Sequence, residues 1–289
     1  MNPPKDVPAA PGDAAFLAEE ARRHDPDRYL CALFAPAERR DALLGLLLFN
    51  QELARIPELV SQPMAGMIRY QWWREAVTEA AQGRPRAHPV VRALAAPLRE
   101  ARLDPARLLA LVDARESELD ALAPADLAAL EAYAGNTAGA LQAAAVALLG
   151  GAGTAWEARA RLVGTAFGLV GILRAVAFQS RRQRVLLPED LLGAAAVSPA
   201  EVMAASARAG LARVFQRITE RADALLDEAG RNAPRVPREL SAALLPAVPA
   251  RWYARRLGAV GGDPARAAEL HPPASMPLRL LGAYLRGRV

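Results

Sequence analysis

The residues best suited to bind an anion lie between Gly171 and Pro188. This segment, GILRAVAFQSRRQRVLLP, begins apolar, turns basic and contains no Asp or Glu. Its arginines are Arg174, Arg181, Arg182 and Arg184. Arginine suits phosphate and carboxylate partners because its planar guanidinium can donate two parallel hydrogen bonds. The segment therefore predicts either an anion-binding surface or a solvated basic turn.

Two acidic clusters have spacings that would allow metal binding. In RADALLDEAG, Asp223 and Asp227 are four residues apart and share one face of a predicted helix. The second cluster, in DARESELDAL, consists of Asp113, Glu116 and Asp120. We favour a solvated helix face for both clusters, with a relocated metal site as the alternative. The three histidines are scattered and the chain has one cysteine, so no His/Cys metal site is expected.

The composition is that of a folded, arginine-rich protein. Of its 289 residues, 53% are hydrophobic and 23% are charged, which excludes a disordered chain. The net charge is +5, and only Lys5 among the 36 basic residues is a lysine. A GC-rich genome would produce such a bias, but an anionic membrane or acidic protein partner would also fit it. We predict no nucleic-acid partner. The single cysteine rules out an internal disulfide and fits a reducing compartment.

Apolar residues recur at helical spacing nearly throughout, which predicts an all-α protein of roughly a dozen helices. Prolines and capping residues mark most of the predicted helix starts. The expected helices begin at Pro26, Pro36, Pro63 and Pro105, then span about 126–149, 155–178 and 198–230, followed by three shorter ones. Pro57 should end or kink the second helix, and Gly83 should end the third. We expect a disordered lead-in over residues 1–12 and one domain over residues 13–289.

The most apolar stretches, residues 143–149 and 162–173, are shorter than the roughly 20 residues that cross a bilayer. The first residues, MNPPKDVPAAPGD, lack the apolar core of a signal peptide. We therefore expect a cytoplasmic protein without a membrane-spanning segment.

Four blocks together resemble the squalene/phytoene synthase family in their order and spacing. They are YLCALFAPAERRDALLGLLLFNQELARI, IRYQWWREAV, YAGNTAGALQAAAVALLG and ILRAVAFQSRRQRVLLP. The resemblance covers residues 25–190 well and the C-terminal third loosely. It implies a single-domain, all-α isoprenoid synthase-like bundle around a central cavity. In the family, two Asp-rich motifs hold the Mg²⁺ that carries the prenyl diphosphates.

The second family motif, R-D-x-x-x-D, is incomplete in this chain. Arg174 is retained, but Ala175 and Gln179 stand at the two aspartate positions. Alanine offers no ligand and a glutamine amide is a weak neutral one, whereas Mg²⁺ prefers carboxylate and phosphate oxygens.

The first family motif, D-D-x-x-D, is also altered. The aligned segment FNQELARIPE places Ala54, Arg55 and Glu58 at the acidic positions. The sequence therefore predicts no catalytic residue, no metal ligand and no cofactor. Mg²⁺ would be required only if the chain is an active enzyme.

The resemblance implies a set of residues that line the cavity or bind an anion. These candidates are Arg40, Asn50, Glu52, Arg55, Arg69, Trp73, Asn136, Arg174 and Arg184. For the tryptophans of YQWWRE we favour ring burial over ligand stacking. We expect Asn136 to be buried with a polar partner. We expect Arg174 to pair with Glu52, or otherwise with a bound anion.

YLCALFAPAERR, FNQELARI and VDARESELD resemble the branch of the family that lacks the Asp motifs and includes a mitochondrial assembly factor for respiratory complex I. This resemblance implies a non-catalytic protein that assists complex I assembly. Complex I subunits or assembly proteins would be its partners, and a prenyl or lipid chain its ligand. An active prenyl diphosphate transferase with a diverged metal site is the alternative. The positive charge adds an expected peripheral contact with the anionic inner face of the cytoplasmic membrane.

Overall fold

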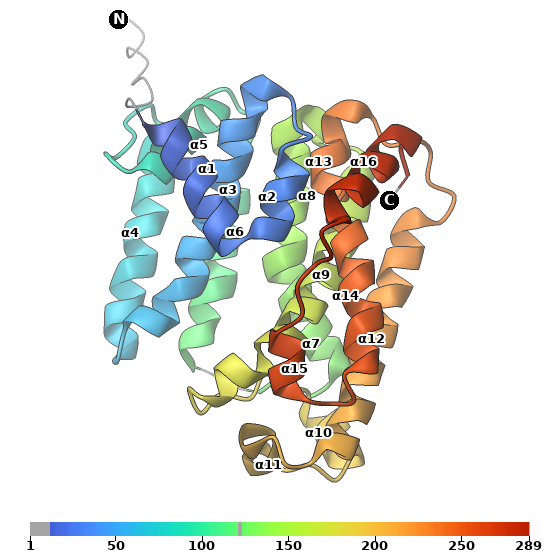
Figure 1. Ribbon diagram of the computed structural model, residues 1–289. Helices are drawn as coiled ribbons and strands as arrows, with labels where there is room; N and C mark the ends of the chain where they lie inside the picture. Colours follow the sequence, from blue (N-terminus) through green and yellow to red (C-terminus); the bar gives the residue numbers. More distant parts are fainter. Residues whose placement is uncertain (1–11, 121–122, 289) are drawn as a thin grey trace, which may run out of the picture. The chain divides into compact units, whose positions relative to one another are not determined.

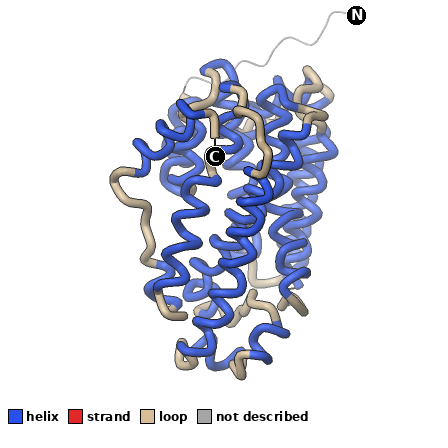
Figure 2. The backbone as a smooth tube through the Cα atoms, turned by 90° about the vertical axis from the view of Figure 1, so that its right-hand side faces the viewer, coloured by secondary structure: helices blue, strands red, loops and turns tan. Residues whose placement is uncertain are grey.

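The computed structural model describes residues 12–120 and 123–288, and every regular element within these ranges is a helix (Figures 1 and 2). The all-α prediction is confirmed. The predicted lead-in lies outside the described residues, apart from Gly12. The chain divides into two compact units. Unit 1 contains Met1–Asp120, Ala140–Glu157 and Pro237–Ala243, and unit 2 contains Ala121–Gly139, Ala158–Val236 and Leu244–Val289. The predicted single domain stays a prediction.

Unit 1 is built around the long helix α3. Its main helices are α1 (Asp13–His24), α2 (Pro26–Ala32), α3 (Ala37–Leu59), α4 (Pro63–Ala81), α5 (Pro89–Arg99), α6 (Pro105–Glu116) and α8 (Ala140–Val146). The short turns η1 (Ser117–Asp120), η3 (Ala147–Gly151) and η4 (Arg238–Leu240) complete it, with the start of α13 (Ser241–Leu244). Helix α3 packs against α1, α4 and α5. Leu46, Phe49 and Leu53 of α3 are fully buried, so its apolar side forms the core of the unit.

Prolines and aspartates start the helices of unit 1 as predicted. Pro26, Pro63 and Pro105 each occupy a first helical position, where the missing N–H has no helical partner to lose. The Asp104 side chain accepts a hydrogen bond from the backbone N–H of Ala106 at 2.9 Å. Pro57 lies two residues before the end of α3, close to the predicted end.

Unit 2 contains the second group of helices. These are α7 (Leu127–Ala134), the π-helical turn η2 (Gly135–Gly139), α9 (Ala155–Ser180, from Ala158 on), α10 (Glu189–Ala194), α11 (Pro199–Ala204), α12 (Arg208–Gly230), α14 (Ala247–Ala259), α15 (Pro264–Ala268) and α16 (Met276–Arg286). Helices α12 and α14 run side by side, and α16 packs on α14 (Figure 1). Together with η4 and α13, described above, they make more closing helices than the three predicted from the sequence.

The predicted single helix over residues 198–230 is wrong. Ser198 does cap a helix, with Glu201 completing a capping box, but that helix is only α11. Ala205 then adopts a left-handed conformation with φ 52° and ends it. The start of α12 packs closely against Val197, which precedes α11. A Cβ added at Gly210 would lie only 2.3 Å from Val197 Cγ2. The apolar pattern continues across the break between α11 and α12, so periodicity alone could not reveal that break.

Helix α9 is longer than the apolar stretch expected at residues 162–173. Within the described residues it is the one helix whose length and composition would allow it to cross a membrane, with a mean hydropathy of 1.6 over 18 residues. Of that window, 44% is buried, and Val163, Ala166 and Leu169 are fully enclosed. A buried core helix has the same length and composition, so these two properties do not make α9 a membrane span.

Candidate functional site

An asparagine and an arginine meet where the resemblance predicted a ligand site. Asn50, on α3, is only 4% exposed, and its Oδ1 accepts a hydrogen bond from Arg115 Nη2 at 3.1 Å. Arg115 Nη1 also donates to Glu118 Oε1 at 2.7 Å, and both of these side chains are largely buried. The Asn50 amide is therefore held by a charged network inside unit 1.

Tyr70 ties this network to the neighbouring helices. Its ring is fully buried, and its hydroxyl lies 2.9 Å from the carbonyl of Arg115 and 3.2 Å from that of Leu53. The sequence analysis selected neither Arg115 nor Tyr70 as a site residue. Two features of the sequence could have indicated them: the charged run DARESELD, which contains Arg115, and the tyrosine of YQWWRE, whose hydroxyl needs a hydrogen-bond partner when buried.

Trp73 belongs to an aromatic cluster. It makes edge-to-face contacts with Phe49, Trp72 and His88, with ring centroids 5.3, 4.9 and 5.3 Å away. Because Trp73 is 5% exposed, the structure favours ring burial over ligand stacking. Burial lowers the pKa of His88, while the carboxylate of Glu52 opposes that shift.

The remaining unit 1 candidates have separate positions. Arg40 Nη2 lies 3.2 Å from the carbonyl of Leu33 and 3.1 Å from that of Ala35, so it closes the turn after α2. Arg69 is exposed on α4, and Arg55 is half-buried on α3. Ligand binding by these arginines stays a prediction.

In unit 2, Arg174 is held by an aromatic ring and a carbonyl. Its guanidinium carbon lies 3.9 Å from the centroid of the Tyr253 ring, and its Nη2 donates to the carbonyl of Leu270 at 3.2 Å. Glu52 belongs to unit 1, so its predicted pair with Arg174 stays a prediction.

The predicted basic turn forms directly after α9. The backbone N–H of Arg184 donates to the carbonyl of Gln179 at 3.0 Å, and Gln183 adopts a left-handed φ of 58°. Arg181 and Arg182 are exposed, with the Arg182 guanidinium 4.8 Å from the Phe178 ring centroid, while Arg184 is half-buried. Anion binding by this turn stays a prediction.

The prediction that Asn136 is buried is wrong. Asn136 is exposed on η2, and its neighbours Thr137 and Ala138 take the buried side of that turn. Thr137 Oγ1 donates to the carbonyl of Tyr133 at 2.8 Å. A Cβ at Gly168 would lie 3.0 Å from Ala138 Cβ, so small residues are needed on the buried side.

Arginine side chains form ion pairs with acids of both acidic clusters. Arg74 Nη2 bonds Asp113 Oδ1 at 2.6 Å and also bonds Glu116, whereas Arg251 Nη1 lies 2.8 Å from Asp227 Oδ1. Arg251 is also 3.9 Å from Asp223. Within the described part of the chain, no group of three or more His, Cys, Asp or Glu residues could hold a metal ion. These contacts favour paired helix faces over relocated metal sites.

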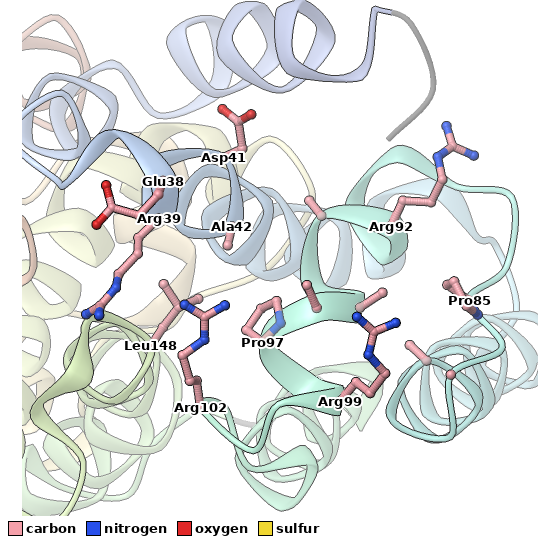
Figure 3. A pocket seen from close by; sticks show the side chains of 15 residues that line it. Glu38, Arg39, Asp41, Ala42, Pro85, Arg92, Pro97, Arg99, Arg102 and Leu148 are labelled. Atoms are coloured by element: carbon pink, nitrogen blue, oxygen red, sulfur yellow. The ribbon is translucent and has the colours of Figure 1, made fainter. Parts of the chain in front are cut away.

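A pocket of about 290 Å³ lies in unit 1, at a place that the sequence analysis missed (Figure 3). Glu38 and Asp41 line it together with Arg39, Arg92 and Arg102. Arg92 donates two hydrogen bonds of 2.7 Å to Asp13, and Arg39 donates to the carbonyl of Leu149. Arg102 also pairs with Glu100. Because both signs of charge line the pocket and three of its arginines bond within the protein, it is not a single-sign anion site.

The sequence profile of squalene/phytoene synthases matches residues 21–278. The chain belongs to the squalene/phytoene synthase family. It is also similar to two mammalian proteins named NADH dehydrogenase (ubiquinone) complex I, assembly factor 6. The rat protein is 31% identical over 89% of this chain and 77% of its own length. The human protein is 30% identical over 96% of this chain and 82% of its own length.

The fold is that of a solved family member. A crystal structure of a dehydrosqualene synthase in complex with ligand superposes with a TM-score of 0.81 at 16% identity. The match covers 94% of this chain and 95% of the synthase. At this identity, the match establishes the isoprenoid synthase fold but not the activity.

Of the residues that the sequence resemblance aligns with the family's metal positions, only Glu58 keeps a carboxylate, and the other four do not fit Mg²⁺. Ala54 and Ala175 carry no ligand atom, Arg55 is a cation, and Gln179 offers only a neutral amide. Mg²⁺ in proteins is bound through carboxylate and phosphate oxygens. We therefore assign no chemical step to a metal ion in this chain.

Proposed function

We propose that this chain is a non-catalytic member of the squalene/phytoene synthase family that assists assembly of respiratory NADH dehydrogenase (complex I). The observation that carries the proposal is that Ala54, Arg55, Ala175 and Gln179 stand at four of the five positions aligned with the metal-binding acids, with Glu58 at the fifth. The buried hydrogen bond from Arg115 to Asn50 supports it, because side chains at this site bond to each other. The mammalian relatives named as complex I assembly factors support the assembly role. Complex I subunits or other assembly proteins are the proposed partners.

The proposal includes a place in the cell and a ligand class. The protein acts in the cytoplasm, against the inner face of the cytoplasmic membrane, where its net charge of +5 favours anionic lipid. A prenyl or other lipid chain is the proposed ligand, because the fold is shared with an enzyme of isoprenoid chemistry.

Deletion of the gene in its host tests the assembly role. We expect less assembled complex I on native gels and a lower NADH dehydrogenase activity of the membranes, while isoprenoid hydrocarbons stay unchanged. The wild-type gene on a plasmid should restore both readouts. Normal complex I together with the loss of an isoprenoid product would overturn the proposal in favour of a transferase.

The purified protein allows a separate test for transferase activity. With labelled farnesyl or geranylgeranyl diphosphate and Mg²⁺, we expect only background product, because a metal cage that stabilises the leaving diphosphate is missing. A hydrocarbon product that depends on the metal would instead establish an active enzyme with a diverged site.

A further inference from the structure

Helix α16 is apolar on two opposite faces, and only one of them is packed. Met276, Leu280 and Ala283 are buried, and the helix packs on α14. Three leucines on the opposite side are exposed, Leu278 by 70%, Leu281 by 42% and Leu285 by 66%. Their spacing of three and four residues places them in one row along the helix. This leucine row is exposed to solvent along the helix.

Arginines lie beside the leucine row. A groove of about 420 Å³ between α14 and α16 is lined by Arg251, Arg255, Arg279, Arg286 and Arg288, and by no carboxylate within the described chain. Arg251 is already engaged by Asp223 and Asp227 of α12. Arg255 interacts electrostatically with Asp223. The other three, Arg279, Arg286 and Arg288, are exposed and form no ion pair with any carboxylate that the structure describes. A cluster of positive charge therefore faces outward next to exposed apolar side chains.

Two further details fit the same surface. Trp252, half-buried on α14, lines the groove and presents an amphipathic ring. The Arg286 guanidinium lies over Gly282, because a Cβ at that glycine would be 3.2 Å from Arg286 Nη1. Gly282 stands in the same helical row as the leucines, so Arg286 is held beside them.

We propose that α16 and this groove dock the protein onto an anionic lipid bilayer. The leucine row enters the boundary of the acyl chains while the arginines bind the lipid phosphates, as in interfacial amphipathic helices. With 11 residues, α16 lies in the plane of the interface, since about 20 residues are needed to span a bilayer. Charge complementarity selects an anionic surface, and the protruding leucines favour lipid over an acidic protein. The inference rests on the membrane contact included in the proposed function and names the surface that makes it, but it does not depend on the assembly role.

Flotation of the purified protein with lipid vesicles tests the proposal. We expect binding to phosphatidylcholine vesicles containing about one third phosphatidylglycerol, weaker binding as salt rises, and little binding to phosphatidylcholine alone. The double variant Arg279→Gln with Arg286→Gln should lower partitioning about 25-fold, since each basic residue near such a surface contributes about fivefold. The double variant Leu278→Ser with Leu285→Ser should lower it about tenfold through lost apolar burial.

Two matched variants control for exposure elsewhere. Arg217→Gln on α12, where the side chain is 64% exposed, and Ile68→Ser on α4, 65% exposed, should leave partitioning within twofold of the wild type. Melting curves should show that all variants remain folded. Wild-type partitioning by both α16 variants, or equal binding to neutral vesicles, would overturn the proposal. Failure to bind any vesicle would also overturn it and direct attention to an acidic protein partner.

Discussion

Arginine has different tasks in the two units of this molecule. In unit 1, Arg74, Arg86 and Arg92 each bond a carboxylate from another part of the chain, and Arg115 bonds Glu118 three residues later. In unit 2, Arg174 bonds a carbonyl and lies over an aromatic ring, whereas Arg279, Arg286 and Arg288 of the groove are exposed and form no ion pair with a described carboxylate. The division is incomplete, because Arg221 of unit 2 binds Glu131 through two hydrogen bonds. Composition alone could not distinguish an arginine that braces the fold from one that meets an external anion.

Burial explains why these tasks differ in energy. The side chains of Arg92 and Asp13 are 15% and 9% exposed, so removing either partner leaves a charge that water cannot fully solvate. The arginines around α16 are surrounded by water, where salt screens their interactions. Stability measurements should therefore depend on the first group, and binding measurements on the second.

The largest loss of stability is expected from Arg115→Met. This change leaves the buried Asn50 amide and the Glu118 carboxylate without their guanidinium partner, and should lower the free energy of unfolding by about 3 kcal/mol. Urea unfolding measures the loss. The control Arg217→Met, on an exposed surface, should change stability by less than about 0.5 kcal/mol. A loss no larger than that of the control would show that the network does not brace unit 1.

A smaller loss is expected from Arg92→Met. The two hydrogen bonds to Asp13 join α5 to α1, and their removal should cost about 2 kcal/mol because the Asp13 carboxylate stays largely buried. Adding Asp13→Leu to this variant should recover part of the loss, since the orphaned charge is then removed. Purely additive losses in this double-mutant cycle would remove the ion pair from the explanation.

Acidification should produce the smallest effect. Burial keeps the pKa of His88 below its ordinary value, so as pH falls through about 6.5 the unfolded chain takes up a proton that the folded chain does not. Stability from this group is therefore present at neutral pH and lost towards pH 5.5. Glu52 and Asp13 act to raise this pKa and Arg92 acts to lower it, and their effects are smaller than or opposed to that of burial.

The variant His88→Phe isolates this contribution. It preserves the ring packing against Trp72 and Trp73, and the fall in melting temperature between pH 7.5 and 5.5 should become smaller. An unchanged fall would assign the pH dependence to other groups.

The sequence predicted features whose causes are local. The helix starts at Pro26, Pro63 and Pro105 and the cap at Ser198 follow from interactions within one turn, and the structure has them. The reversal at Ala205 depends on packing between Gly210 and Val197, which no helical pattern encodes.

The candidate site was predicted less completely for the same reason. Asn50 was selected from its position in the family motif, but its partner Arg115 is 65 residues away in the sequence. Asn136, in the block YAGNTAG, was expected inside, yet the geometry of η2 places Thr137 on the buried side.

The contact between Asn50 and Arg115 also bears on the history of the protein. Ala54 lies one helical turn after Asn50, on the same face of α3, so we expect an aspartate placed there to lie near the Arg115 guanidinium. We therefore expect that no single substitution would restore metal binding. A lineage that regained carboxylates would also have to discard Arg115, which the fold of unit 1 now uses. Because removal of Arg115 would lower the stability of the fold, a return to metal binding would need several substitutions at once.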